Sequence, residues 1–333
     1  MHRYELKDQI GQILVNVELG EREDTYDLKR QRMRGAWMEP WISLCCYKLD
    51  DSPEGDCDVS LRSMVYFSLA LGYREKWGIE RQPMRFLNYQ LAPRETSNNR
   101  RYILRGDTTN SYATTVHRYL TLLDQEREEG SRLNPRDENW EEVVLRDLPK
   151  VKQAVSPAAL AFIGRVHTIG NMIPVPCLLN ESGKKVIASF NAPRYRNSMD
   201  YWDLTLLCLC HYYTGRTSGD RTLEWLLPKE ADRSLCMAWL DSFGEKEEGW
   251  NSFVEQNLLQ DFVNAAPGGG YAQPRELWPG HFTGGVLPDK DQCEMFFANA
   301  GSWIAARSLR MVTRAREALK EMPLPDIAEE LLP

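Results

Sequence analysis

The stretch that decides this fold reads Gly164-Arg165-Val166-His167-Thr168-Ile169-Gly170-Asn171-Met172-Ile173-Pro174-Val175-Pro176. A helical pattern leads into it, and we expect that helix to stop near Gly170, because glycine is common just beyond a helix C-terminus. Beyond the glycine, Val175–Leu179 and Lys185–Phe190 have the composition of two short strands around a turn that contains Gly183. The stretch therefore predicts a change from helix to β-hairpin.

A second helix follows the hairpin. Its apolar pattern runs from Asp200 to about Tyr213 and includes Trp202 and Leu206. Asp200 and Asp203 are three residues apart, which resembles a capping box with an acid in place of glutamate. Ionisable and amide side chains are concentrated between this helix and the one before the hairpin, so we predict the functional site there.

The rest of the chain is mainly helical in pattern. Tyr102–Leu104 has the composition of a brief strand, and the Gly- and Pro-rich segment 265–279 is typical of a long loop. We therefore predict a mainly α fold: a multi-helix single domain with a small β-hairpin near residues 175–190. Apolar periodicity predicts further helices over residues 4–19, 26–41, 59–77, 109–124, 223–227, 232–243, 250–262 and 292–320.

A charged loop over residues 125–139 offers one boundary between subdomains. It would divide an N-terminal part, 1–125, from a C-terminal part, 140–322. Apolar helical stripes occur on both sides of the loop, and neither half looks self-sufficient. We therefore favour one continuous domain over residues 1–333.

Composition limits the classes of function. The net charge of −7 gives no overall attraction to nucleic acid or to an anionic membrane, although a local basic patch remains open. No apolar run reaches the roughly 20 residues that a bilayer requires. The eight cysteines include no C-x-x-C pair, and the chain shows no signal peptide. These features predict reduced thiols, a cytoplasmic location and no membrane partner.

His167 is the candidate catalytic residue, because imidazole gives and takes protons near neutral pH. In a helix, His167 and Asn171 would share one face, with Arg165 close by. The alternative is that His167 caps the helix C-terminus while Asn171 lies in a turn. Both interpretations remain open at the level of sequence.

Asn191, Arg194 and Arg196 lead from the hairpin into the helix that opens at Asp200. Helix N-termini attract anions, and arginine presents a planar fork to phosphate or carboxylate. We therefore predict a phosphate-binding corner made of these residues with Arg165 and Asn171. The alternative is that an arginine pairs with Asp200 or Asp203 and only fastens the hairpin to the helix.

Other sites have weaker support. Cys208 and His211 lie one helical turn apart, but no second ligand pair at zinc spacing accompanies them, so no metal is predicted. The sequence identifies no cofactor. His281, near Trp278, indicates only that its loop could cover the site.

Three motifs resemble an uncharacterised bacterial family of unknown function. They are Thr168-Ile169-Gly170-Asn171-Met172, Asp200-Tyr201-Trp202-Asp203-Leu204-Thr205-Leu206 and Leu258-Leu259-Gln260-Asp261-Phe262, and a segment around His117 also looks similar. The resemblance covers about two thirds of the chain. It implies a mostly helical protein of bacterial or phage origin and implies no activity.

A shorter segment, His167-Thr168-Ile169-Gly170-Asn171, resembles the H-T-x-G-N segment of HNH-type nuclease domains. In those domains an upstream Asp-His element activates water beside a metal-bound phosphate. This chain has no such element, since the nearest upstream histidine, His117, lacks that context. The resemblance alone therefore does not imply nuclease activity.

Three functional hypotheses follow. The first is a protein that binds an anionic ligand, such as a nucleotide or a nucleic-acid phosphate, at the His/Asn/Arg corner. The second is a hydrolase acting on a phosphodiester or nucleotide, with His167 as acid and base and arginines as electrophilic stabilisers. The third is a non-catalytic helical interaction protein in which the polar residues only fasten the hairpin. No protein partner is predicted.

Overall fold

The computed structural model describes residues 94–95, 101–110, 115, 118–119, 122–123, 125, 155–165, 169–179, 186–190, 193–194, 198, 201–284 and 287–321. The helices predicted within residues 1–93 and the proposed boundary loop lie outside the described residues. All structural statements below concern the described part of the chain.

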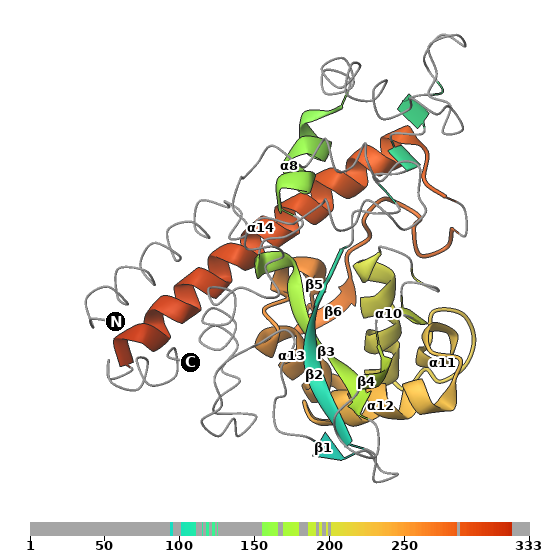
Figure 1. Cartoon of the computed structure of the whole chain (residues 1–333), viewed down its shortest axis with the longest axis vertical. Coiled ribbons are helices and arrows are strands. Elements are labelled where there is room, and N and C mark those ends of the chain that lie inside the picture. Colours follow the sequence, from blue (N-terminus) through green and yellow to red (C-terminus); the bar gives the residue numbers. More distant parts are fainter. Residues whose placement is uncertain are drawn as a thin grey trace.

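The fold is mainly α, as the periodicity predicted. The described residues hold six α-helices: α8 (Pro157–Arg165), α10 (Trp202–Tyr213), α11 (Leu223–Leu226), α12 (Glu230–Asp241), α13 (Lys246–Gln256) and α14 (Lys290–Glu321). Two short 3₁₀-helices, η4 (Ile169–Asn171) and η5 (Gln260–Phe262), precede strands. In Figure 1, α14 runs diagonally across the molecule with α8 beside its upper half.

The predicted hairpin is confirmed, and it forms part of a larger sheet. Strands β3 (Met172–Leu179) and β4 (Val186–Ser189) pair antiparallel, and β2 (Arg101–Thr108) and then β1 (Arg94–Glu95) extend the sheet on the other side of β3. The sheet is therefore larger than the small hairpin predicted from the sequence. The brief strand expected at Tyr102–Leu104 is eight residues long, because Arg101 pairs with β1 and every residue from Tyr102 to Thr108 pairs with β3.

Strand β3 carries two prolines although it lies between two neighbours. Proline lacks the N–H that a central strand normally donates. The Pro176 carbonyl accepts a hydrogen bond from the Phe190 amide, so this residue's backbone polar groups face the β4 side. Pro174 has the same orientation, and β4 pairs only with Cys177–Leu179. The positions at which Pro174 and Pro176 lack an N–H therefore face the β4 side of β3, outside the Cys177–Leu179 segment that pairs with β4.

Helices cover the sheet and one another through buried aromatic contacts. The Trp239 ring of α12 packs edge-on against Phe190 at 5.8 Å, and the Tyr102 hydroxyl of β2 donates to the Ala238 carbonyl of α12. On the other side of the molecule, Phe162 of α8 meets Phe296 of α14 at 5.1 Å. The sheet and the helices thus share one continuous apolar core.

A buried arginine fastens α14 to the stretch that decides the fold. Arg307 has 0% exposure, and its guanidinium donates to the carbonyls of Gly170 (2.8 Å), Met172 (2.5 Å) and Asn257 (2.9 Å). Gly170 lies against α14 so closely that an added Cβ would clash with the Ile304 carbonyl and the Ser308 hydroxyl. The glycine is therefore required by this contact. It is the middle residue of η4, whereas α8 ends at Arg165, so Gly170 does not have the helix-ending position predicted from the sequence.

Two further predictions need correction. The helix expected over 250–262 ends at Gln256, because Leu258 has a φ of 55° and the amide of Leu259 bonds back to the Val254 carbonyl, a left-handed helix stop. The long loop expected over 265–279 contains a second hairpin, β5 (Val263–Ala265) with β6 (Tyr271–Pro274).

Candidate functional site

One polar cluster lies where β2, β3 and α10 meet; we call it the amide cluster and define it as Thr109, Asn110, Asn171 and Arg194. All four side chains have 0% exposure. The Asn171 side-chain oxygen accepts hydrogen bonds from the Thr109 hydroxyl (2.5 Å) and from the backbone N–H of Asn110 (2.9 Å). The Asn171 side-chain nitrogen donates to the backbone carbonyl of Asn110 (2.8 Å). The Asn171 side chain is thus held at both ends by the turn that follows β2.

Arg194 and Asn110 connect this cluster to α10. The Arg194 guanidinium donates to the Thr109 carbonyl at 3.4 Å and lies 5.1 Å above the Trp202 ring. The Asn110 side chain accepts from the Trp202 amide, at the first residue of α10. That N–H would have been a contact for an anion at the helix N-terminus. Here the protein's own side chain occupies it.

A second polar group lies on the first turn of the same helix. The Asp203 carboxylate has 0% side-chain exposure and lies 2.6 Å from Nδ1 of His281, whose side chain keeps 5% exposure. The carboxylate also accepts from the amides of Leu277 (2.9 Å) and Leu204 (2.8 Å). Asp203 is therefore fixed by two backbone groups, and it in turn orients the imidazole.

Aromatic rings enclose the imidazole. The Trp278 ring lies 3.7 Å from it, centroid to centroid, at 32°, and the Tyr201 ring meets it edge-on at 4.7 Å. With Nδ1 directed at Asp203, the second ring nitrogen, Nε2, is the one left for a further partner. Among the described residues, Asp203 is the side chain that hydrogen-bonds to this ring.

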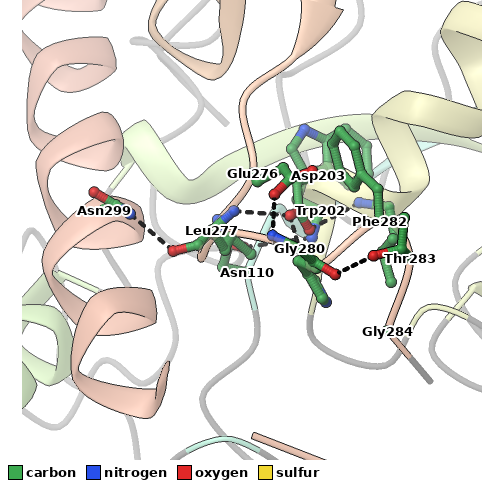
Figure 2. Close-up of polar contacts among 12 residues, drawn as sticks. Asn110, Trp202, Asp203, Glu276, Leu277, Gly280, Phe282, Thr283, Gly284 and Asn299 are labelled. Atoms are coloured by element: carbon green, nitrogen blue, oxygen red, sulfur yellow. Dashed lines mark hydrogen bonds and ion pairs between the residues drawn. The ribbon is translucent and has the colours of Figure 1, made fainter. Parts of the chain in front are cut away.

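The loop that carries His281, residues 276–284, is held from several sides. Within the loop, Glu276 accepts from the Gly280 amide, and Asn299 of α14 donates to the Leu277 carbonyl at 2.8 Å, as Figure 2 shows. Arg221 reaches in from the turn before α11 and donates to the Phe282 and Gly284 carbonyls. The loop is irregular yet fixed, which suits a residue that must hold one orientation.

Arg221 itself has a strained backbone. Its φ is 62°, a conformation that costs a non-glycine residue energy and that persists where the surroundings enforce it. Its carbonyl accepts from Nδ1 of His211 at 2.8 Å, and its guanidinium lies 4.5 Å above the Trp225 ring. The strain is thus located in the residue that anchors the His281 loop.

The structure describes three of the sequence-predicted site residues and brings two of them together. Arg165 is half-buried and donates to the Gly301 carbonyl, which ties α8 to α14. Asn171 and Arg194 come together in the amide cluster. His167, Asn191, Arg196 and Asp200 lie outside the described residues, so their roles remain predictions.

Sequence reasoning did not identify the Asp203–His281 pair. The two residues are 78 positions apart, and nothing local links them. Asp203 was interpreted as part of a capping box, but the N-cap is Tyr201, without a side-chain cap, and the Asp203 carboxylate accepts from the next amide and from the His281 loop. The sequence contains one indication of this pair, the short spacing between Trp278 and His281. From that spacing the sequence predicts only a loop that could cover the site.

Cysteine and metal chemistry find little support in the described residues. Burial raises the pKa of the Cys210 and Cys293 thiols to about 12 each, so both stay protonated and are poor nucleophiles. His211 uses Nδ1 on the Arg221 carbonyl. Within the described ranges, no three His, Cys, Asp or Glu side chains are grouped as metal ligands, and no helix combines the length and apolar character of a membrane span.

Comparisons of the chain with models of protein families, with curated proteins and with solved structures found no match.

Proposed function

We propose that this chain binds an anionic ligand, a nucleotide or the phosphate of a nucleic acid, and that the imidazole of His281 contacts it. The observation that carries the proposal is the 2.6 Å pair of Asp203 and His281, in which the carboxylate side chain has 0% exposure and the histidine side chain keeps 5%. Anchoring through Nδ1 directs Nε2 away from the carboxylate. A protonated imidazole held in this way donates a charge-assisted hydrogen bond to a phosphate oxygen.

The surroundings of the pair support ligand binding over a purely structural role. A buried carboxylate that already accepts two backbone amides has its main hydrogen-bonding needs met without the histidine. The Trp278 ring, 3.7 Å from the imidazole, supplies a π face that attracts a cation. Tyr201 contacts the same imidazole edge-on, with ring centroids 4.7 Å apart.

A second candidate function is hydrolysis of the same class of ligand. The specific observation in its favour is the arrangement of a carboxylate, an imidazole held by it and a remaining ring nitrogen, which is the geometry of a general base with its orienting group. In this candidate the neutral His281 takes a proton from water through Nε2. His281 replaces His167 as the residue to test first.

The cellular location and the origin of the protein are proposed from two other observations. The described cysteines, Cys177, Cys208, Cys210, Cys236 and Cys293, are free thiols, which fits a reducing compartment such as the cytoplasm. A bacterial or phage origin rests on the family resemblance alone.

Thermal unfolding with a panel of phosphate compounds tests the binding proposal. The probes are inorganic phosphate, nucleoside mono- and triphosphates and a single-stranded oligonucleotide. A ligand present at 100 times its Kd stabilises the folded state by about 2.7 kcal/mol, so we expect at least one probe to raise Tm. His281→Gln should lose that rise while remaining folded.

The matched control is His211→Gln, which changes a second histidine that also uses Nδ1 in a hydrogen bond. It should keep the ligand-dependent rise in Tm. An unchanged rise in His281→Gln would move the binding site elsewhere. If no probe raises Tm, the anionic-ligand proposal fails and the non-catalytic interaction protein is the hypothesis that remains.

Release of p-nitrophenol from bis(p-nitrophenyl) phosphate, measured with and without added divalent metals, tests the hydrolase candidate. We expect His281→Gln and Asp203→Asn to lower the rate together, by about 100-fold or more for the histidine. Equal rates in wild type and His281→Gln would remove the pair from any hydrolytic mechanism.

A further inference from the structure

His281 lies between two points at which its loop is fastened to the rest of the fold. The point before the histidine is Leu277, whose amide donates to the Asp203 carboxylate and whose carbonyl accepts from Asn299 of α14. These contacts fix the first half of the loop from two elements. They do not reach the backbone beyond His281, which needs support of its own.

Arg221 is the second point, and it holds the loop after the histidine. Its guanidinium donates to the Phe282 carbonyl at 3.4 Å and to the Gly284 carbonyl at 2.9 Å. The Gly284 amide bonds back to the Gly280 carbonyl, and the Thr283 hydroxyl donates to that same oxygen (Figure 2). The turn that carries the histidine is thus closed on itself, and Arg221 connects it to the segment before α11.

The backbone of Arg221 is fixed at the same time as its side chain. Its carbonyl accepts from Nδ1 of His211 on α10 at 2.8 Å. The next residue, Thr222, is the N-cap of α11 and accepts from the Trp225 amide. The Trp225 ring lies 4.5 Å from the guanidinium carbon. Arg221 is therefore a rigid connection from α10 and α11 to the loop.

The backbone conformation of Arg221 is one that glycine adopts without strain. Its φ of 62° lies in the left-handed region, which is unfavourable for a residue with a Cβ. A glycine would keep the hydrogen bond from His211, because that bond uses the backbone carbonyl. A glycine would not reach the loop. The contacts of the arginine side chain are thus what offsets the strain, and strained residues of this kind cluster at ligand sites.

We infer that Arg221 is a positioning residue for His281: it holds the second half of the loop so that Nε2 of the imidazole keeps one direction. The inference rests on the proposed contact between His281 and an anionic ligand. Arg221 acts through the loop backbone. An imidazole that is already ordered raises affinity, because the ligand does not have to order the loop when it binds. Removing the guanidinium should therefore loosen the imidazole more than it loosens the fold.

NMR of the imidazole without ligand tests the positioning directly. The chain has five histidines, and in protein with isotope-labelled histidine the ring signals of His281 are those missing from His281→Gln. In wild type we expect one narrow set of these signals. In Arg221→Gly we expect them to be broadened and to show relaxation dispersion, because the loop then exchanges between positions on the microsecond-to-millisecond timescale.

Two matched controls separate positioning from general effects of the substitution. Lys246→Gly relieves a similar backbone strain, with φ 48°, at the first residue of α13. Arg233→Ala removes another guanidinium that donates to two backbone carbonyls, which lie between α11 and α12. Both variants should leave the His281 ring signals as they are in wild type. Arg221→Lys keeps a cationic donor and should restore part of the narrow signal.

Thermal unfolding shows whether Arg221 serves the fold instead. Arg221→Gly relieves the backbone strain while it removes the two carbonyl contacts, so we expect its Tm to stay within about 3 °C of wild type. A much larger fall in Tm, or a variant that does not fold, would mark Arg221 as a structural residue and overturn the inference.

Titration with inorganic phosphate connects the positioning to binding. The shift of the His281 ring signals reports the Kd, which Arg221→Gly should raise at least about tenfold and Lys246→Gly should leave unchanged. If phosphate shifts no His281 signal in wild type, the proposed contact with the ligand fails, and the ligand-free signals still decide whether Arg221 positions the histidine. Signals in Arg221→Gly as narrow as those of wild type would overturn the inference in either case, and so would an unchanged Kd.

Discussion

The amide cluster and the Asp203–His281 pair flank the same first turn of α10, and they use polar groups in opposite ways. In the amide cluster, every side chain has 0% exposure, and Asn171 makes three hydrogen bonds to a single turn. In the pair, the carboxylate has 0% side-chain exposure and the imidazole keeps 5%. Fully buried polar groups whose hydrogen bonds are made within the protein specify structure, whereas an imidazole that is held in one orientation and keeps one ring nitrogen for a further partner can act on a ligand.

Arginines follow the structural pattern of the amide cluster. The sequence-based hypothesis assigned arginine forks to phosphate, but in the described residues many of these groups bind the protein's own backbone. Those that donate to main-chain carbonyls are Arg118, Arg165, Arg194, Arg221, Arg233, Arg275 and Arg307. A guanidinium with several donors suits this task as well as it suits an anion. Counting arginines near a helix start therefore predicts little about ligands.

The largest effect is expected from Asn171→Leu. The substitution leaves the Asn110 amide, the Asn110 carbonyl and the Thr109 hydroxyl without their buried partner, so we expect the free energy of unfolding to fall by about 3 kcal/mol or more. Urea denaturation measures it. The control is Asn299→Leu, which removes the single bond to the Leu277 carbonyl and should cost about 1 kcal/mol. Equal losses would contradict the contrast between the two regions.

A medium effect is expected from Gly170→Ala, next to the amide cluster. The added Cβ meets the Ile304 carbonyl, which belongs to the backbone of α14 and cannot move aside. We expect a loss of about 1–3 kcal/mol in the free energy of unfolding. Gly268→Ala is the control, because no atom lies within 4 Å of its added Cβ. An unchanged free energy of unfolding in Gly170→Ala would mean that η4 is not in close contact with α14.

The smallest effect is a dependence of the free energy of unfolding on pH, and it comes from His211. Burial lowers the pKa of His211 below its ordinary 6.5, so the unfolded chain binds a proton more readily than the folded one. The stability contributed by neutral His211 is complete above pH 6.5 and is lost as pH falls toward its folded pKa. Urea denaturation of wild type and His211→Gln between about pH 7.5 and about pH 5.5 measures this difference.

We expect the wild type to lose more stability on acidification than His211→Gln does. If His211→Gln is as sensitive to acid as wild type, His211 is not the group that resists protonation.

The sequence was most informative where structure is local. Helical periodicity located α11, α12 and α14 to within two residues at each end, and the composition around Gly183 located the β3–β4 hairpin. It was least informative for β2, because Gly106 and Asp107 have low strand propensity, although the charged residues Arg101, Arg105 and Asp107 share one face of the strand. Pairing with β3, about 70 residues away, forms that strand.

The candidate site shows the same limit. Asn171 and Arg194 were selected for their chemistry, but their burial and partners depend on the turn after β2, which sequence spacing does not reveal. Asp203 and His281 could be paired only by knowing that the 276–284 loop returns to α10. Side chains brought together from distant segments escape any argument based on spacing.

The position of Arg307 has a consequence for the order of folding. The Arg307 guanidinium donates hydrogen bonds to the Gly170 and Met172 carbonyls, yet Arg307 follows these two residues by more than 130 positions in the sequence. During synthesis, that middle segment emerges long before the helix able to satisfy its carbonyls, and closing so long a loop is entropically expensive. We therefore expect the N-terminal end of β3 to reach its final structure late, after α14 has been synthesised.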